Sequence, residues 1–193
     1  MANSSTQWPL VLTTERFTLR PLRLRDKAQW DRVRAENHEW LTPWEATLPR
    51  FHGEGATQRF PSFFAMVANH NREGKSGRSL SMAIWHENKI VGQITMGGII
   101  YGALRGAHIG YWVDKRYANL GIITQAVKTM TEYAFTVLEL HRIEINVRPE
   151  NIASRRVAEK AGYVFEGERP RFLHIDGQWR DHLCFVKENT NIF

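Results

Sequence analysis

The stretch that decides the fold runs from His108 to Ala126 and reads HIGYWVDKRYANLGIITQA. Its first six residues, His108 to Val113, are rich in β-formers and predict a strand that ends at Asp114. A short loop follows, and Gly121 opens a segment whose apolar residues recur at helical spacing. The stretch therefore predicts a strand, a loop and the beginning of a helix.

The beginning of such a helix is a suitable place for phosphate groups. Its first backbone N–H groups lack intrahelical acceptors, and the positive end of the helix dipole favours an anion. A P-loop would need Gly, four residues and Gly-Lys-Ser/Thr, and a dinucleotide fold would need three glycines after its strand. The stretch contains neither motif, so it indicates a nucleotide-like cofactor held by a different loop.

Periodic patterns on both sides of this stretch predict a mixed sheet with helices. The other expected elements are, in order, a strand over 11–22, a helix over 24–38 capped by Asp26, a helix over 57–72, strands over 79–86 and 89–100, a strand over 142–147, a short helix ending at 161, and strands over 163–175 and 178–187. Hairpin turns are expected at Glu87-Asn88 and Asp176-Gly177. The strand, helix and strand between His108 and Val147 predict a right-handed crossover, so these two strands should lie parallel.

Composition limits the class of protein. With 193 residues, 42% hydrophobic content and seven Trp, residues 1–193 suit one globular domain with a polar N-terminal tail of about nine residues. Cys184 is the single cysteine, which excludes an internal disulfide, and no Cys/His cluster has zinc spacing, so we expect no metal. Met1 to Pro9 does not resemble a signal peptide and no apolar run could span a bilayer, which predicts a cytoplasmic protein without a membrane partner.

The formal charge of +6 favours acidic surroundings. Cofactor phosphates, an acidic peptide or RNA would each suit it, and so would an inert basic surface. Since the chain carries no named RNA-binding motif, we expect no sequence-specific binding of nucleic acid.

Three motifs give the chain a family resemblance. Residues 116–121, Arg-Tyr-Ala-Asn-Leu-Gly, resemble the Arg/Gln-x-x-Gly-x-Gly/Ala motif of the GNAT acetyltransferases, with Asn119 in place of the first Gly. Because Asn tolerates a left-handed backbone, the loop shape should be kept. Residues 148–154 are similar to the family's Asn-x-x-Ser segment, and residues 161–167 to its Gly-aromatic-x-x-Glu-Gly continuation.

Two further segments extend the resemblance to nearly the whole chain. Residues 40–45 and 173–182 are similar to the RimJ and RimL branch, the ribosomal-protein N-terminal acetyltransferases. The resemblance implies an α/β GNAT fold, with a mixed, mostly antiparallel sheet, a V-shaped splay and helices on both faces. It also implies direct transfer of an acetyl group from acetyl-CoA to an amine, without an acyl-enzyme. No nucleophile-base motif surrounds Cys184, which agrees with direct attack.

The resemblance points to the N-terminal α-amine of a protein as the acceptor, with a ribosomal protein that begins with Ala or Ser as the preferred substrate. Two other readings stay open. One is an enzyme for a small amine such as an amino acid, polyamine or antibiotic. The other is a non-catalytic module that binds ribosomal RNA or an assembly particle. Whether the protein forms a homodimer is also open.

The resemblance also assigns catalytic residues. Glu166, in the Glu-Gly of the third motif, would be the base that deprotonates the amine, unless it is a solvated or ion-paired carboxylate. Glu144 is the second candidate, and strand alternation places it on one sheet face with Asn146, which points into the cleft or to an unrelated partner. Ser154 would protonate the departing thiolate and Asn151 would bind the pantetheine amide, although both residue types are ordinary helix N-caps.

The remaining site residues follow from the same resemblance. Main-chain groups of Tyr111, Trp112 and Val113 would contact pantetheine, and a backbone N–H at this strand end would stabilise the charged thioester oxygen. Pyrophosphate contacts would come from residues 116–124, namely Arg116, Asn119, Gly121, Ile122, Ile123 and Thr124. The candidate walls of the acceptor site are Trp40, Trp44, Glu45, His174 and Trp179.

Overall fold

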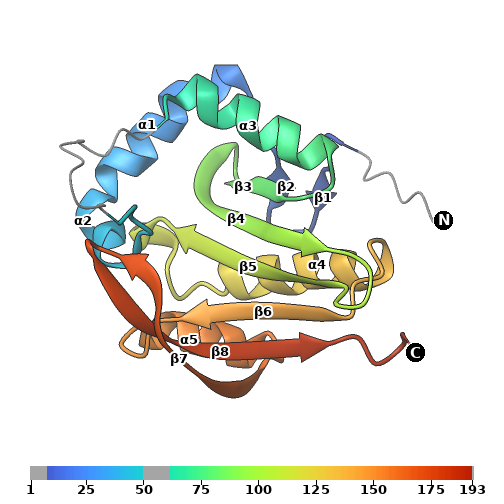
Figure 1. Cartoon of the computed structure of the whole chain (residues 1–193). Helices are drawn as coiled ribbons and strands as arrows, with labels where there is room; N and C mark the ends of the chain where they lie inside the picture. Colours follow the sequence, from blue (N-terminus) through green and yellow to red (C-terminus); the bar gives the residue numbers. More distant parts are fainter. Residues whose placement is uncertain (1–7, 50–60, 193) are drawn as a thin grey trace.

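The computed structural model describes residues 8–49 and 61–192, and in this part of the chain eight strands form one sheet (Figure 1). The strand order is β1-β2-β3-β4-β5-β6-β8-β7, and every neighbouring pair is antiparallel except β5 and β6. The strands are β1 Leu12–Thr13, β2 Thr18–Arg20, β3 Leu80–His86, β4 Lys89–Ile100, β5 Gly106–Val113, β6 Arg142–Val147, β7 Val164–Ile175 and β8 Gln178–Glu188. The expected mixed, mostly antiparallel sheet is confirmed.

Helices cover both faces of this sheet. They are α1 Lys27–Glu36, α2 His38–Leu41, α3 Phe63–Lys75, α4 Ile122–Thr136 and α5 Ile152–Lys160, with short 3-10 turns η1 Leu24–Asp26, η2 Thr42–Trp44 and η3 Lys115–Tyr117. None of the helices in the described part of the chain is long and apolar enough to cross a bilayer.

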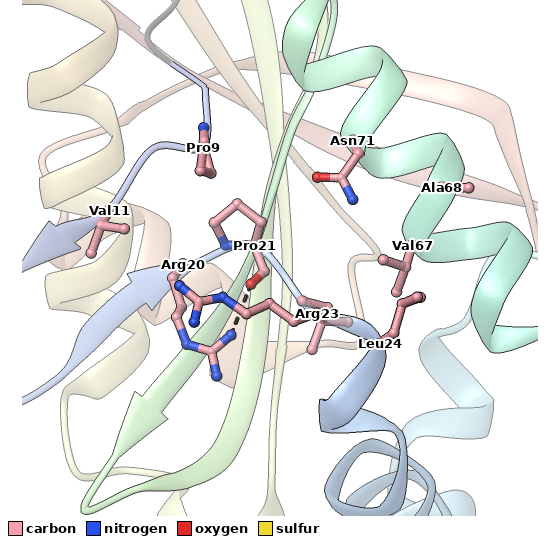
Figure 2. Close-up of a pocket in the computed structure, with 10 residues that line it drawn as sticks. Pro9, Val11, Arg20, Pro21, Arg23, Leu24, Val67, Ala68 and Asn71 are labelled. Carbon is pink, nitrogen blue, oxygen red and sulfur yellow. Dashed lines mark hydrogen bonds between the residues drawn. The ribbon is translucent and has the colours of Figure 1, made fainter.

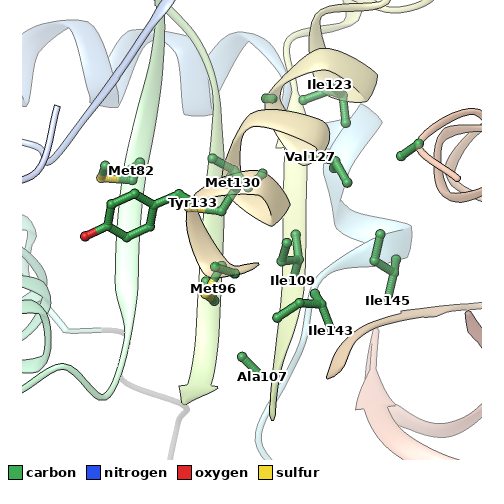
Figure 3. Close-up of a cluster of buried hydrophobic side chains, with 14 of the residues drawn as sticks. Met82, Met96, Ala107, Ile109, Ile123, Val127, Met130, Tyr133, Ile143 and Ile145 are labelled. Carbon is green, nitrogen blue, oxygen red and sulfur yellow. The ribbon is translucent and has the colours of Figure 1, made fainter. Parts of the chain in front are cut away.

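Two separate apolar clusters show which helix covers which face. On one face, α4 buries Val127 and Met130 against Ile109 of β5 and Ile143 of β6 (Figure 3). On the other face, α1 and α3 bury a smaller cluster, which includes Val33, Val67 and Ala83 of β3. Successive side chains of the central strands therefore point to opposite faces of the sheet and pack into two different clusters, as strand geometry requires.

Both predicted hairpin turns are confirmed. Glu87 and Asn88 have φ angles of 48° and 61°, and Asp176 and Gly177 have 47° and 74°. Two successive left-handed residues are the geometry of a two-residue type I′ turn, which matches the right-handed twist of the paired strands. The parallel crossover from β5 through α4 to β6 is also confirmed.

Two expectations for the first forty residues were wrong. The strand expected over 11–22 is two short strands, because Thr14 closes a turn by donating its N–H to the Phe17 carbonyl at 2.9 Å. The helix expected over 24–38 ends at Glu36, because the Asn37 side chain bonds to the Val33 carbonyl. The Asp26 carboxylate does not cap α1, but it accepts the N–H of Arg23 at 2.8 Å and so caps the preceding turn η1, while it also forms an ion pair with Arg20 at 2.8 Å.

The helix expected over 57–72 begins later. α3 starts at Phe63, where the Ser62 hydroxyl accepts the N–H of Ala65 at 3.2 Å, and it runs to Lys75. This is an ordinary N-cap, in which the Ser hydroxyl accepts a first-turn N–H that has no acceptor within the helix. The N-cap fixes the beginning of the helix more strongly than the apolar spacing that suggested an earlier one. Residues 57–60 of the expected helix lie outside the described residues.

Candidate active site

β5 and β6 separate partway along their length, and the gap between them is the candidate site. They pair at only three positions, of which His108 opposite Glu144 is the last. Beyond that pair, β5 continues to Val113 against β4, and β6 continues to Val147 against β8. Each strand therefore has a backbone edge that pairs with no other described strand, and such an edge can bind a ligand that contains amides.

The loop between β5 and α4 leads directly into the first turn of a helix, where backbone N–H groups can bind a phosphate. Asn119 and Gly121 are both left-handed, with φ angles of 61° and 76°. α4 begins at the next residue, so the N–H groups of its first turn, on Ile122, Ile123 and Thr124, lie at the end of this loop. The left-handed backbone expected for Asn119 is confirmed.

Arg16 lies against this loop from the turn between β1 and β2. Its Nη2 donates to the Leu120 carbonyl at 2.9 Å, and its Nη1 lies 3.8 Å from the place where a Cβ on Gly121 would stand. The side chain is exposed to solvent. A guanidinium group therefore lies beside the first turn of α4, and sequence reasoning missed it because Arg16 is 104 residues from Leu120.

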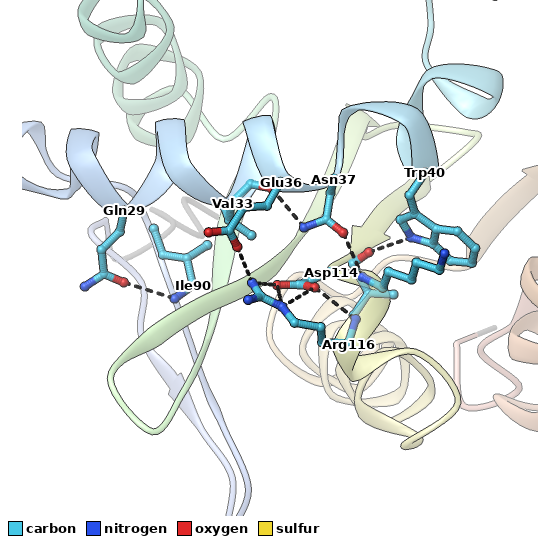
Figure 4. A network of polar contacts seen from close by, with 10 residues as sticks. Gln29, Val33, Glu36, Asn37, Trp40, Ile90, Asp114 and Arg116 are labelled. Carbon is cyan, nitrogen blue, oxygen red and sulfur yellow. Dashed lines mark hydrogen bonds and ion pairs between the residues drawn. The ribbon is translucent and has the colours of Figure 1, made fainter.

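Asp114 organises the start of the loop (Figure 4). It is buried, and Arg116 binds it through the backbone N–H at 3.0 Å and through the guanidinium at 2.5 Å. Burial alone would raise the pKa of Asp114, but the hydrogen bonds from Arg116 outweigh it and lower the pKa. Because Arg116 also binds Glu36 of α1 at 2.6 Å, the charge expected to face pyrophosphate is shared with two carboxylates.

Asn37 and Trp40 fasten the same loop to the helices above it (Figure 4). Asn37 Oδ1 accepts the N–H of Lys115 at 2.8 Å, and Trp40 Nε1 donates to the Val113 carbonyl at 3.0 Å. The Lys115 ammonium lies 5.9 Å from the centre of the Trp40 ring. Trp40, an expected wall of the acceptor site, thus lies over the end of β5.

Tyr111 of β5 and Ser154 of α5 meet through their side chains. The Tyr111 hydroxyl lies 2.8 Å from Ser154 Oγ and donates to the Ser154 carbonyl at 3.2 Å. Asn151 is the N-cap of α5, and its Oδ1 accepts the N–H of Ser154 at 3.0 Å. Burial raises the pKa of Tyr111 and the Ser154 hydrogen bond offsets this only in part, so the phenol stays protonated. No local pattern predicts this side-chain pair, because Tyr111 and Ser154 are 43 residues apart in the chain.

Glu166 and Glu144, the two predicted bases, lie together around Arg142. Arg142 donates to the two oxygens of Glu166 at 2.8 Å and 2.5 Å, and to Glu144 Oε1 at 3.0 Å and 2.9 Å. Arg169 binds the other oxygen of Glu144 at 2.8 Å. The Cys184 thiol lies 3.9 Å from Glu166. With both carboxylates held by guanidinium groups, this cluster has the chemistry of an ion-pair network rather than a metal site.

The ion pairs also weaken both carboxylates as proton acceptors. A hydrogen bond from Arg142 lowers the pKa of Glu166. Burial alone would raise the pKa of Glu144, but Arg169 and Arg142 outweigh it and lower the pKa. Glu144 lies opposite His108, where β5 and β6 begin to separate, whereas Glu166 lies on β7 with a side chain that is 49% exposed.

A pocket of about 240 Å³ lies on the sheet face that α4 does not cover. Its walls are Leu41, Trp44, Glu45, Ala46, Gln93, Thr95, Gly110, Tyr111 and Trp112. Glu45 is the one charged residue among these walls, and it forms an ion pair with Arg34 of α1. Trp112 Nε1 donates to Gln93 Oε1 at 3.2 Å. Of the predicted acceptor walls, the structure brings Trp44 and Glu45 into this pocket.

His174 and Trp179 lie on the β7–β8 hairpin, beside the pocket but outside its walls. Their rings meet edge to face with centres 5.5 Å apart, and His174 Nδ1 lies 2.7 Å from Thr47 Oγ1. A β-bridge between Ala46 and Ile175 joins this hairpin to the segment after Glu45. The two residues therefore support the segment that carries Glu45.

A larger pocket of about 410 Å³ lies away from the splay, between α3, η1 and the first two strands (Figure 2). Its walls are mostly apolar, and Arg20 among them is already bound to Asp26 through two hydrogen bonds of 2.8 Å and 3.1 Å. None of its wall residues comes from β5, β6 or α5. It is therefore separate from the candidate site.

Comparisons with known proteins agree with this geometry. The family model described as Acetyltransferase (GNAT) domain matches residues 16–164. The chain is 28% identical over 175 residues to the ribosomal protein uS5-alanine N-acetyltransferase of Escherichia coli (strain K12), a match that covers 89% of this chain and 87% of that protein. Over 105 residues it is 45% identical to "Probable N-acetyltransferase YjcK" of Bacillus subtilis (strain 168), which covers 54% of this chain and 58% of that relative.

A solved structure resembles the whole fold. Mycobacterium smegmatis RimJ in complex with CoA-disulfide has a TM-score of 0.85 and 36% sequence identity to this chain, and the match covers 96% of this chain and 90% of that one. The splayed strands and the left-handed loop before α4 fit such a cofactor, since they present backbone groups for amides and phosphates. The chain belongs to the GNAT family and is an acetyltransferase that uses acetyl-CoA as its acetyl donor.

Proposed function

We propose that this acetyltransferase modifies the N-terminal α-amine of a protein, and that its substrate is a ribosomal protein beginning with Ala or Ser. The name of the Escherichia coli relative, which specifies alanine of ribosomal protein uS5, supports this substrate class. The chain also resembles part of a spermidine N(1)-acetyltransferase from the same organism, with 32% identity over 79 residues and 41% of this chain covered. We take the pocket of about 240 Å³ as the acceptor pocket, and its charge and size indicate which of these two substrate classes it fits.

The charge of the acceptor pocket carries the proposal. Among the described residues, Glu45 is the one charged residue in its walls, and Arg34 neutralises that carboxylate. A polyamine carries several ammonium groups and calls for several unpaired carboxylates, whereas a protein N-terminus carries one. The volume of about 240 Å³ is also below the roughly 300–1,000 Å³ of pockets that enclose a drug-sized ligand. A pocket of this size suits the first residue or two of a chain whose remainder lies outside.

Several chain segments would hold the donor. Acetyl-CoA supplies an acetyl group that is activated as a thioester. The backbone of β5 from Tyr111 to Val113 would pair with its pantetheine amides, and the first-turn N–H groups of α4 would bind its pyrophosphate. Asn119 and Gly121 shape that loop, and Arg16 adds positive charge beside it, whereas Arg116 shares its charge with Asp114 and Glu36.

Ser154 and Tyr111 would serve the leaving group. Ser154 Oγ is oriented by the Tyr111 hydroxyl at 2.8 Å, and Asn151 fixes the first turn of α5 that carries it. A hydroxyl in this place can donate a hydrogen bond to the departing sulfur, where negative charge develops. Tyr111 in turn keeps its proton, because burial raises its pKa.

For removal of the amine proton we propose Glu144, acting through water, with Glu166 as the alternative. A free α-amino group has a pKa of about 7.7–8.0, so part of the acceptor is already neutral near pH 7.5 and a weak base is sufficient. Guanidinium groups hold both oxygens of each carboxylate, but Glu144 lies at the point where the strands separate, whereas Glu166 lies on β7. The position of Glu144 is therefore the better one for a proton acceptor.

Intact-mass analysis of peptides beginning with Ala, Ser, Met and Gly, with spermidine in parallel, tests the substrate class. We expect one acetyl group on the α-amine of the Ala and Ser peptides and none on spermidine. Acetylation of spermidine alone would refute the peptide proposal. Glu144→Gln should reduce the rate at least 10-fold and Glu166→Gln less, and the reverse order would assign the base to Glu166.

A further inference from the structure

The side chain of Asn146, in the middle of β6, has a polar atom that the fold leaves unpaired. Its Oδ1 is buried from solvent and accepts no hydrogen bond from any residue in the described ranges 8–49 and 61–192. A buried acceptor without a donor costs about 1–3 kcal/mol, so most proteins avoid it. Such an atom either destabilises the fold for no benefit or awaits a donor from a ligand.

The side chains nearest to Asn146 along β6 and in register on β8 make no hydrogen bond to its Oδ1. Strand alternation puts Asn146 on one face of β6 with Glu144 and Arg148, because Ile145 and Val147 face the apolar core. Arg148 Nη1 donates to the Pro43 carbonyl at 2.7 Å, and its Nε, which makes no hydrogen bond, lies 3.3 Å from Glu150 Oε2 in an ion pair. On β8, the residue in register is Cys184, whose thiol lies 3.9 Å from Glu166.

The other side of Asn146 faces the splay. The last β5–β6 pair is His108 with Glu144, and Asn146 stands two residues beyond it on β6. Two residues beyond it on β5 stands Gly110, which lines the acceptor pocket. A Cβ on Gly110 would meet no atom within 4 Å, so the space in front of this residue is open. Asn146 and the acceptor pocket therefore lie on the same face of the sheet, at the same level of the splay.

We propose that Asn146 orients the acceptor, with its Oδ1 accepting a hydrogen bond from an N–H of the attacking amine. This inference rests on the proposed function and names a further residue at the same site. One hydrogen bond from the amine N–H to Asn146 Oδ1 holds the nitrogen in place, while the lone pair of the nitrogen stays free to attack. Since a neutral amide takes up no proton at these pH values, Asn146 positions the amine and the proton leaves to another group.

Asn146→Leu and Asn146→Asp test the proposal, with steady-state kinetics on an Ala-starting peptide, acetyl-CoA binding and chemical unfolding measured for each. Leu has a similar volume without an acceptor, so kcat/KM for the peptide should fall about 10-fold or more. The Kd for acetyl-CoA should stay within about twofold, and stability should be unchanged or higher because an unpaired polar atom is removed. Asp keeps an oxygen at the buried position and should retain much more activity than Leu.

Asn189→Leu is the matched control. Asn189 is also buried, but its amide donates to the carbonyls of Phe135 and Leu140 at 3.2 Å and 3.3 Å. This variant should lose stability, while the folded protein keeps its kcat/KM. The proposal predicts the opposite pattern for Asn146→Leu, with activity lost and stability kept.

Three results would overturn the inference. The first is that Asn146→Leu leaves the kinetics with the peptide unchanged. The second is that Asn146→Leu loses as much stability as Asn189→Leu. The third is that Asn146→Leu raises the Kd for acetyl-CoA enough to account for the whole loss of activity. The last result would assign the Asn146 hydrogen bond to the donor. A wild-type protein that acetylates no peptide would refute the proposed function as well, whereas an active wild type with an unaffected variant refutes this inference alone.

Discussion

At the scale of single residues, Tyr111 and Ser154 act as one unit, which predicts that their substitutions are not independent. Tyr111→Phe and Ser154→Ala each break the 2.8 Å hydrogen bond between the two hydroxyl groups. We expect each to lower kcat roughly 10-fold, and the double variant to lower it by much less than the product of the two, since contacting residues couple. Steady-state kinetics at saturating acetyl-CoA measures all three.

Tyr163→Phe is the control for this cycle. The Tyr163 hydroxyl lies 2.6 Å from Thr131 Oγ1 in the apolar core, so its loss should cost about 1 kcal/mol of unfolding free energy and leave kcat unchanged. Strictly multiplicative effects in the double variant would show that Tyr111 does not act through Ser154.

The sequence predicts which residues belong to the site, but it does not predict the residues with which they form ion pairs. Glu166 was predicted as a base from its motif, yet the strand register brings it to Arg142, 24 residues away. Arg34 of α1 likewise pairs with Glu45, which lies 11 residues further along the chain. Neither pairing follows from local pattern, because both depend on how separate elements pack.

At the scale of elements, the loop before α4 depends on two left-handed residues. Asn119→Gly should preserve acetyl-CoA binding, since glycine adopts a φ of 61° without strain. Asn119→Val should weaken binding at least 10-fold, because a β-branched residue in this region is strongly disfavoured. Titration of acetyl-CoA by calorimetry checks both variants, and equal affinities would show that the loop does not need this conformation to bind the cofactor.

Asp114 ties the same loop to the sheet, and its ionisation gives a pH-dependent prediction. Its pKa is lowered in the folded protein, so its contribution is fully present above the unfolded value of about 3.9 and is lost as pH falls through the folded value. Asp114→Asn should therefore cost about 2 kcal/mol at pH 7, and less below about pH 4.

Urea unfolding of both proteins at pH 7 and at pH 3.5 measures this difference. Lys27–Asp31, an exposed ion pair on α1, supplies the control, since Asp31→Asn should change stability by less than about 1 kcal/mol at either pH. A cost for Asp114→Asn that does not change with pH would mean that the hydrogen-bond geometry matters and the charge does not.

Some elements of the fold can be predicted from their own residues, and others cannot. The turns at Glu87-Asn88 and Asp176-Gly177 were predictable because the residues themselves favour the left-handed geometry that the turns need. The division of residues 11–22 into β1 and β2 was not predictable, because it depends on a single turn at Thr14 within a sequence that otherwise alternates as one strand would. The splay was predictable only through the family resemblance, since no local signal shows where two parallel strands stop pairing.

At the scale of the whole molecule, a bound cofactor should stabilise the elements that meet around the splay. β5, α4 and α5 meet around the splay, so a ligand bound there stabilises the folded state by about 2.7 kcal/mol at 100 times its Kd. For a chain of this length that corresponds to a rise in Tm of roughly 5–10 °C.

Hydrogen exchange locates this stabilisation and separates the two pockets. With acetyl-CoA at a concentration far above its Kd, amides of β5 from Ile109 to Val113 and of the first turn of α4 should exchange more slowly. Amides of α3 around Val67 and Asn71, which line the larger pocket, should gain less protection. If α3 gained the protection and α4 did not, the larger pocket would be the cofactor site. The donor would then lie beside β2, whose Arg20 lines that pocket, and the assignment of the separated β5 and β6 edges as the cofactor site would be refuted.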